Sequence, residues 1–302
     1  METLPKVETI RISYSKAQAF KSCEYKFWLA HVRKYADDSV KPGLMPNEKS
    51  EALRRGTHGH LMMEWFHNEV KDTLEFPYDP QECSRIMSSV VARGIALNYE
   101  DTSTIMKQML HYAANVFPYK NWRILEVEKE YRLEVGRDPI TGLMKVVPGT
   151  IDLVVDISGT VVIIDHKFSA DAYKPDRIEI EPQIPVYIGE MRALGIPVRY
   201  GIYNFMRTRK MNNVEEQVVQ EPVKPNDIRI QQSFADHLTT IVKIIEFQEK
   251  LKQPGFIPTR SASNNCDYCD FRRLCKTALK GEDTTAMIEH GFTANDYGYE
   301  DL

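Results

Sequence analysis

Two aspartates and one lysine have the spacing expected of a small cation site. Ser158 and Gly159 lie between two apolar runs, and this pattern predicts a two-residue β-hairpin turn. In that register Asp152 lies opposite Asp165, and Lys167 shares the face of Asp165 because side chains alternate along a strand. Two directly opposed carboxylates repel each other, and a divalent cation between them would remove the repulsion.

Two alternatives to this interpretation of the hairpin stay open. A three-residue loop over 157–159 would shift the register by one and move Asp152 off the shared face. The two aspartates could also face solvent on a sheet with one wet face. The four apolar residues before Asp165 argue against the second alternative, since they predict a strand that is buried on both faces.

The elements around the hairpin predict an α/β fold, with a central mixed β-sheet flanked by helices. Ser13 or Ser15 is the expected cap of the first helix. Apolar periodicity predicts helices over about 13–34, 50–73, 81–116, 183–194 and 227–252. It predicts strands over 123–136, 143–157, 160–168 and 198–207. Because strands and helices alternate only in part, a mixed α+β core is expected.

Composition narrows the class of protein. The 302 residues are 42% hydrophobic and 27% charged, which supports a buried core and excludes a disordered chain. No apolar run approaches the roughly 20 residues of a membrane helix, so no membrane partner is expected. The net charge of −4 excludes a wholly basic nucleic-acid coat but not a local basic channel. Residues 280–302 hold six acids and one base, which predicts a solvated or partly disordered tail.

The cysteines require a separate explanation. Cys266, Cys269 and Cys275 form C-x2-C-x5-C, and Cys23 lies far upstream. Four thiolates can hold a tetrahedral zinc ion or an iron–sulfur cluster. Zinc sites usually combine two nearby pairs, so a three-plus-one arrangement fits zinc poorly. Cys83 is left over and is interpreted as a small buried residue. Without a secretory signal, five cysteines indicate a reducing, cytoplasmic compartment.

The hairpin motif resembles the PD-(D/E)xK nuclease superfamily. Gly149 and Asp152 supply G-x2-D, and Asp165 and Lys167 supply D-x-K. Two further motifs make the chain similar to RecB-type nucleases. They are R-G-T-x2-H-x3-E (Arg55, Gly56, Thr57, His60 and Glu64) and Q-x3-Y (Gln183 and Tyr187). His58 and His67 are not expected to be ligands.

The cysteine set resembles the iron–sulfur clamp of AddB-type nucleases and of CRISPR-associated iron–sulfur exonucleases. The surrounding frame also matches, with Ser13, Ser15, Phe20, Cys23 and Phe27. Glu24 departs from the proline that commonly follows the first cysteine, although it is not a ligand. The resemblance extends from about residue 13 to 275. It implies one RecB-like nuclease domain over 1–280, followed by the acidic tail 281–302. The parts of that domain are a helical part (13–120), a nuclease core (121–210), and a C-terminal helix with the cysteine segment (225–280).

The resemblance also implies roles for individual residues. It assigns Mg²⁺ or Mn²⁺ to His60, Asp152, Asp165 and the backbone carbonyl of His166. Lys167 would orient or deprotonate the attacking water. A [4Fe–4S] cluster is assigned to Cys23, Cys266, Cys269 and Cys275. Gln183 and Tyr187 would lie beside the active site and help to hold DNA or position the lysine.

Other candidates come from residue type alone. Basic residues that could contact phosphates are Arg207, Arg209, Lys210, Arg272 and Arg273. Tyr173 could stack on a base of single-stranded DNA. For Glu128 and Glu130, which alternate with apolar residues, a surface role is favoured over a supporting role at the metal site.

The function implied is a metal-dependent DNA exonuclease that degrades single-stranded ends in recombination, repair or CRISPR-related processing. The alternatives are a non-catalytic iron–sulfur DNA-binding or scaffold protein and a structure-specific endonuclease. The chain lacks G-x4-G-K-[ST], so any helicase that works with it would be a separate chain.

Overall fold

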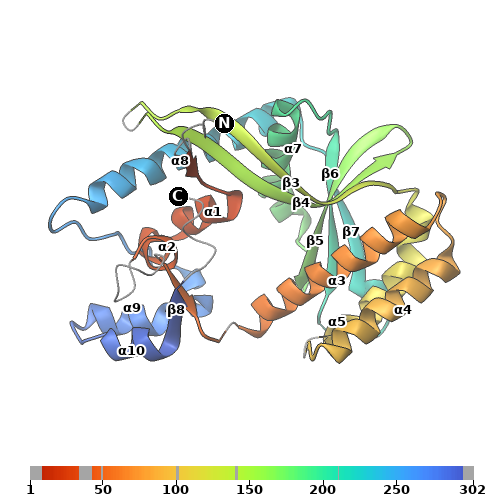
Figure 1. The fold of residues 1–302 in the computed structure, drawn as a ribbon, viewed down its shortest axis with the longest axis horizontal. Helices are drawn as coiled ribbons and strands as arrows, with labels where there is room; N and C mark the ends of the chain where they lie inside the picture. The colour runs from red at the N-terminus through yellow and green to blue at the C-terminus, as the bar shows by residue number, and fades with distance from the viewer. Residues whose placement is uncertain are drawn as a thin grey trace, which may run out of the picture. The chain divides into compact units, whose positions relative to one another are not determined.

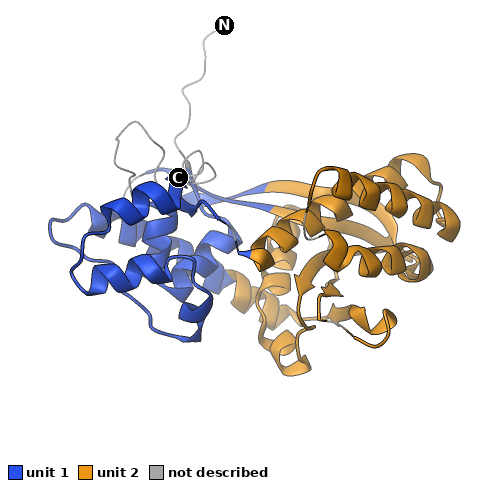
Figure 2. Cartoon of the chain, turned by 90° about the horizontal axis from the view of Figure 1, so that it is seen from below, with its two compact units in different colours: residues 1–50, 132–149, 235–302 blue, residues 51–131, 150–234 orange. Residues whose placement is uncertain are grey.

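The structure is a computed structural model (Figure 1). It describes residues 9–33, 43–48, 50–99, 102–139, 142–209 and 211–294. Lys210 and the last part of the acidic tail lie outside the described residues. The chain forms two compact units that are interleaved in sequence (Figure 2). Unit 1 comprises residues 1–50, 132–149 and 235–302, and unit 2 comprises residues 51–131 and 150–234.

Helices and strands follow one another largely as the sequence predicts, but the helical stretch expected over 81–116 is divided into two α-helices and a short helical turn. The α-helices are α1 (Tyr14–Ser22), α2 (Glu24–His31), α3 (Glu51–Thr73), α4 (Pro80–Ala96), α5 (Thr102–His111), α6 (Pro175–Ile180), α7 (Gln183–Ala193), α8 (Asp227–Leu251), α9 (Arg272–Leu279) and α10 (Thr285–Gly291). The strands are β1 (Thr9–Arg11), β2 (Leu44–Pro46), β3 (Arg123–Arg137), β4 (Met144–Ile157), β5 (Thr160–Ser169), β6 (Tyr200–Arg207), β7 (Val218–Val223) and β8 (Phe292–Ala294). Short helical turns follow α5 and precede β7 and α9.

The predicted mixed sheet is confirmed. In the described part of the chain, the order β1-β4-β5-β6-β7 is joined by β3, which pairs with β4. The pairs β1–β4 and β5–β6 are parallel, whereas β4–β5 and β6–β7 are antiparallel. A parallel pair needs a crossover connection, and α6 and α7 supply it between β5 and β6.

The predicted two-residue hairpin between β4 and β5 is also confirmed. Ser158 (φ 52°) and Gly159 (φ 82°) both have positive φ, as a type I′ turn requires. The side chain of Asp156 accepts a hydrogen bond from the Gly159 amide at 2.8 Å. Ile157 therefore pairs with Thr160, and the three-residue alternative is excluded.

Helices of unit 2 cover both faces of its sheet (Figure 1). Side chains of α3, α4 and α5 pack on the face that carries Leu153 and Ile164. Side chains of α7 pack on the opposite face, against Val154 and Ile163. The strand β5 is therefore buried on both faces, as its apolar run predicts. A sheet covered in this way excludes water from the backbone that carries Asp165.

Unit 1 has its own apolar cluster, in which β2 and β8 form a small antiparallel sheet. Ile288 of α10 and Phe292 of β8 are buried in this cluster, and Phe292 stacks on Phe271 with ring centroids 5.5 Å apart. The first half of the predicted tail is thus folded, which differs from the solvated end that its charge predicts. None of the described helices is both long and apolar enough to cross a membrane.

The first predicted helix is interrupted at Cys23. Ser13 caps α1, and its side chain accepts a hydrogen bond from the Lys16 amide at 3.4 Å. Cys23 has an extended backbone (φ −171°, ψ 118°), so it ends α1 and precedes α2. The amphipathic run gives no sign of this break, and the expectation of one helix to about residue 34 is wrong.

The helix α3 approaches β5 closely at one glycine. A Cβ atom placed on Gly59 would lie 2.5 Å from the ring of Phe168. By contrast, nothing lies within 4 Å of the corresponding position at Gly56, which is on the same helix. The two glycines therefore have different reasons to be small.

We expect Gly59→Ala to lower the free energy of unfolding by about 1–3 kcal/mol, because the added methyl group overlaps the Phe168 ring. Gly56→Ala is the matched control, and it should raise that free energy by about 0.5–1 kcal/mol through its higher helix propensity. Guanidinium-induced unfolding of both variants measures the difference. Equal effects would contradict the close approach at Gly59.

Candidate active site

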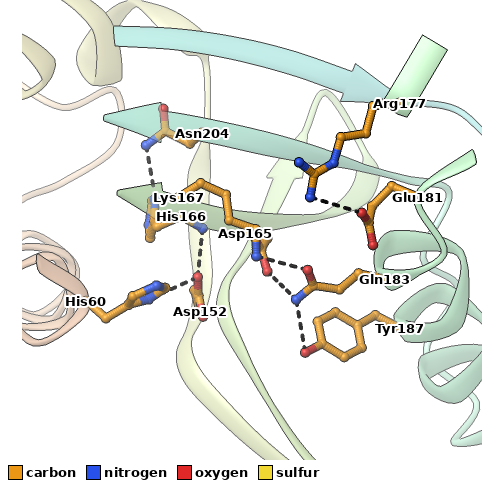
Figure 3. A network of polar contacts seen from close by, with 10 residues as sticks. All are labelled: His60, Asp152, Asp165, His166, Lys167, Arg177, Glu181, Gln183, Tyr187 and Asn204. Carbon is orange, nitrogen blue, oxygen red and sulfur yellow. Dashed lines mark hydrogen bonds and ion pairs between the residues drawn. The ribbon is translucent and has the colours of Figure 1, made fainter. Parts of the chain in front are cut away.

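The ladder between β4 and β5 gives way to a side-chain contact at Asp152. The regular register ends with the pair Leu153 and Ile164. One residue further on, the carboxylate of Asp152 accepts a hydrogen bond from the backbone amide of His166 at 2.7 Å (Figure 3). The side chain of Asp152 thereby bonds an amide of the neighbouring strand, and its position depends directly on β5.

The same carboxylate contacts His60 of α3. The distance from Asp152 Oδ2 to His60 Nδ1 is 3.3 Å. Burial opposes a charge on both groups, but each stabilises the charge of the other. The pKa of His60 is raised as a result, and His60 with the His166 amide lowers the pKa of Asp152 to about 2. The sequence motif that contains His60 thus lies at the hairpin.

Asp165, Lys167 and Gln183 form a closed set of two hydrogen bonds and one ion pair (Figure 3). Lys167 Nζ lies 2.6 Å from Asp165 Oδ2 and donates to Gln183 Oε1 at 2.9 Å. Gln183 Nε2 donates to Asp165 Oδ1 at 2.8 Å and to the Tyr187 hydroxyl at 3.3 Å. The Q-x3-Y motif of α7 therefore holds both the lysine and its carboxylate partner.

Burial sets the protonation of this second group of residues. It raises the pKa of Asp165 to about 6, although Lys167 acts in the opposite direction. Burial alone would lower the pKa of Lys167, but the adjacent Asp165 carboxylate raises it. Lys167 is therefore held as a cation at neutral pH.

Glu128 is a site residue that sequence reasoning missed. One ligand atom each of His60, Glu128 and Asp152 lies within 4.8 Å of the other two. Glu128 is half-buried, and burial together with Asp152 raises its pKa to about 7. This does not fit the surface role favoured for it. The left-handed backbone of Glu128 (φ 44°) interrupts the alternation of β3. The sequence gives no sign of this break, because the residue is neither glycine nor asparagine.

The donor set suits a hard divalent cation. Two carboxylates and one imidazole match the oxygen preference of Mg²⁺, and the imidazole shifts that preference towards Mn²⁺. His60, Glu64 and Glu128 also line a cleft of about 510 Å³, which runs along α3. The residues present therefore fit a divalent metal.

The side chain of His166 points away from these donors. Its Nδ1 accepts a hydrogen bond from Asn204 Nδ2 at 2.9 Å, and its ring stacks on His67. Gln220 in turn donates to Asn204 at 2.8 Å. Burial lowers the pKa of His166 to about 4, so this ring is neutral. His67 is buried beside Tyr112, which agrees with excluding it as a ligand.

The candidate DNA contacts are less well placed. Arg207 and Arg209 both pair with Asp171, at 3.1 and 2.7 Å. Arg207 is largely buried, whereas the Arg209 side chain is 63% exposed. The ring of Tyr173 is covered by the guanidinium of Arg177 at 3.7 Å. Arg209 is therefore more accessible to a phosphate than Arg207. One face of the Tyr173 ring is covered by Arg177 and is not open to a base.

Four cysteines meet in unit 1. Cys23, Cys266, Cys269 and Cys275 all line one cavity of about 370 Å³. The break between α1 and α2 places Cys23 there, with its thiol 3.9 Å from the Thr259 carbonyl oxygen. The Glu24 side chain accepts a hydrogen bond from the Thr259 amide at 3.2 Å, which ties α2 to the cysteine segment. The same cavity is lined by the cationic side chains of Lys26, Arg260, Arg272 and Lys276.

The spacing of the sulfur atoms bears on which group they could hold. A tetrahedral zinc ion with bonds of about 2.3 Å requires thiolates about 3.8 Å apart. Among the described residues, no three cysteine sulfurs lie within 4.8 Å of one another. An iron–sulfur cluster binds each thiolate to a different iron atom, so it accepts wider spacing. Cys83 lies elsewhere, fully buried in the α3–α5 cluster as predicted.

Comparisons with known proteins identify the class. The PD-(D/E)XK nuclease superfamily matches residues 11–276, and the chain belongs to this superfamily. No curated protein sequence matches the chain. The solved structure of a protein called SSO0001 is similar over 72% of this chain and 84% of the SSO0001 chain, with 16% sequence identity and a TM-score of 0.33. The solved structure of a candidate exonuclease from Eubacterium rectale is similar over 91% of this chain and 93% of the other chain, with 13% sequence identity and a TM-score of 0.39. At these TM-scores the assignment depends on the superfamily match alone.

Removing the Gln183 side-chain amide should leave the ammonium group of Lys167 without one of its hydrogen bonds. We expect Gln183→Ala to lower the free energy of unfolding by about 1–3 kcal/mol, because polar groups of Lys167 and Asp165 lose a buried partner. Tyr187→Phe is the control, since it removes the longer bond at 3.3 Å and keeps the Gln183 amide, and it should cost less than about 1 kcal/mol. Chemical unfolding measures both, and a larger loss for Tyr187→Phe would contradict this arrangement.

A buried carboxyl group of α7 is hydrogen-bonded to a tyrosine of β3. Glu190 is fully buried and accepts a hydrogen bond from the Tyr131 hydroxyl. Burial raises the pKa of Glu190 to about 8, against the opposing effect of Tyr131. Between pH 4.5 and 8 the unfolded chain has therefore lost a proton that the folded protein keeps. The contribution of Glu190 to stability is full at low pH and is lost as the pH rises.

We expect the stability of the wild-type protein to fall between pH 6 and 8, with a contribution from Glu190 of up to about 1.4 kcal/mol per pH unit. Glu190→Gln keeps an acceptor for Tyr131 but cannot ionise, so it should flatten this slope. Thermal unfolding across the pH range measures the slope. An unchanged slope in Glu190→Gln would show that another group causes the loss.

Proposed function

We propose that this PD-(D/E)XK protein is a RecB-type, metal-dependent DNA exonuclease that hydrolyses phosphodiester bonds at single-stranded ends. The supporting observation is the convergence of His60, Asp152, Asp165 and Lys167 at the end of one hairpin. These residues come from two distant motifs, and only the fold brings them together. Recombination, repair or CRISPR-related DNA processing would be the setting.

The residues of this site have distinct tasks in the proposed reaction. His60 and Asp152 would hold a divalent metal, with the His166 carbonyl and Asp165 as further oxygen donors. A bound Mg²⁺ or Mn²⁺ supplies Lewis-acid polarisation of the phosphate and a more acidic water. Lys167 stays protonated beside Asp165, so we assign it to the charge that develops on the phosphate rather than to proton removal.

The direct test is degradation of end-labelled single-stranded DNA with Mn²⁺ or Mg²⁺. We expect Lys167→Ala and Asp165→Ala to lower the rate by roughly 10²–10⁴-fold. Lys174→Ala, an exposed lysine in the same region, is the matched control and should keep the wild-type rate. Full activity in Lys167→Ala would exclude the mechanism.

The same assay separates the alternatives. Cleavage of circular single strands would favour a structure-specific endonuclease, since a circle offers no end. Metal-independent DNA binding without any cleavage would favour the non-catalytic scaffold. Arg209→Ala should weaken binding at low salt if this exposed side chain contacts a phosphate.

For the cysteine cavity we propose a [4Fe–4S] cluster held by Cys23, Cys266, Cys269 and Cys275. Support comes from the cavity that the four cysteines share and from its cationic lining, which would offset the negative charge of a thiolate-bound cluster. The link would close a loop of about 240 residues, and such a closure stabilises the folded chain by a few kcal/mol. A structural role is therefore proposed first.

Purified protein should be brown, with broad visible absorption and about four iron atoms per chain. Cys269→Ala should lose the colour and unfold at a lower temperature. Cys83→Ala is the control, because Cys83 lies in a different apolar cluster, and it should keep the colour. Colourless protein with one zinc ion per chain would reverse this assignment.

A further inference from the structure

We propose that Glu128 is a direct metal ligand, which together with His60 and Asp152 forms one cation position. This inference rests on the metal-dependent site proposed above and goes beyond it, because no sequence motif of the hairpin includes Glu128. It assigns one cation position to three different elements, α3, β3 and β4.

The distances among the three donors fit one cation. Two ligand atoms bound to Mg²⁺ or Mn²⁺ at about 2.1 Å are separated by roughly 3 Å when adjacent and 4.2 Å when opposite. His60 Nδ1 and Asp152 Oδ2 are 3.3 Å apart, close to the adjacent spacing. With Glu128 included, no separation exceeds 4.8 Å. Small rotations of the side chains would complete the geometry.

Asp165 occupies a different part of the site. One of its oxygens contacts Lys167 at 2.6 Å and the other accepts from Gln183 at 2.8 Å. In this arrangement one oxygen is paired with the Lys167 ammonium group and the other is hydrogen-bonded to Gln183. Glu128 instead has a carboxylate oxygen within 4.8 Å of the ligand atoms of both His60 and Asp152. Glu128 is thus the carboxylate best placed to join them.

The local path of β3 brings Glu128 to this position. Val127 packs with the cluster of α3–α5, whereas Leu125 and Tyr131 pack with the cluster of α7. Residues two or four apart on a regular strand share a face, so the alternation of β3 breaks within 125–131. The left-handed Glu128 lies at that break, and its side chain lines the cleft along α3. Glu126 and Glu130, which precede and follow it, are exposed.

The charge balance also fits a cation. Glu128 and Asp152 are two carboxylates at short range in a partly buried place, and like charges there destabilise the protein. A divalent cation between them neutralises both charges. Bound Mn²⁺ should therefore raise the unfolding temperature, and this gain should depend on Glu128.

The test is direct Mn²⁺ binding to the intact protein, measured from the EPR signal of free Mn²⁺ without any DNA. Hard Mn²⁺ is a suitable probe because thiolates prefer softer metals. We expect Glu128→Gln to weaken binding about tenfold or more, as Asp152→Asn does. Glu130→Gln is the matched control on the same strand and should change the affinity less than twofold.

Glu128→Gly separates the ligand role from a backbone role. Glycine adopts positive φ without strain, so this variant should unfold at or above the wild-type temperature in metal-free buffer. It should nevertheless lose the Mn²⁺ affinity and the stabilisation that Mn²⁺ confers. That combination supports Glu128 as a ligand.

Two results would overturn the inference. One is wild-type Mn²⁺ affinity in both Glu128→Gln and Glu128→Gly while Asp152→Asn is impaired. The other is a wild-type protein that does not bind Mn²⁺. Failure of the proposed nuclease would look different, since Mn²⁺ would then bind through Glu128 although no DNA is degraded.

Discussion

The hydrogen bond from the His166 amide to the Asp152 carboxylate is the contact on which the site depends. It fixes a side chain of one strand by the backbone of the next, at the residue where the regular ladder stops. The same carboxylate then orients His60 from α3. One carboxylate oxygen of β4, Asp152 Oδ2, thus contacts both the strand β5 and the helix α3. This contact in turn requires the tight Ser158–Gly159 turn, because a longer loop would displace Asp152.

The site has two halves with different supports. His60, Glu128 and Asp152 bring one imidazole and two carboxyl groups together on the side of α3. Asp165 and Lys167 lie on the side of α7, where Gln183 bonds both. The buried His166 ring lies behind the hairpin and is anchored to Asn204. The separation keeps the ammonium group of Lys167 paired with Asp165 and away from His60, Glu128 and Asp152.

Much of this arrangement could be predicted from the sequence, because its determinants are local. Ser158 and Gly159 specify their turn, and the spacing of Gln183 and Tyr187 places both on one helix face. What could not be predicted depends on contacts between distant residues. The helix breaks at Cys23 although the amphipathic pattern of the sequence continues through it. The backbone of Glu128 is left-handed although the residue is not glycine. Ile288 and Phe292 are two apolar residues in an acidic stretch, and their burial depends on a partner strand some 250 residues earlier, at β2.

The burial of β5 between two hydrophobic layers has a consequence for how such a protein can diverge. His60 and Gln183 are carried by helices that contact opposite faces of the same strand. A change in the volume of an interior residue in either layer would shift one helix by a fraction of an ångström relative to β5. The spacing between the metal donors and the lysine could therefore drift while every polar residue stays the same. Relatives with identical motifs need not share one substrate preference, and the difference between them would lie in the buried apolar residues that pack against β5.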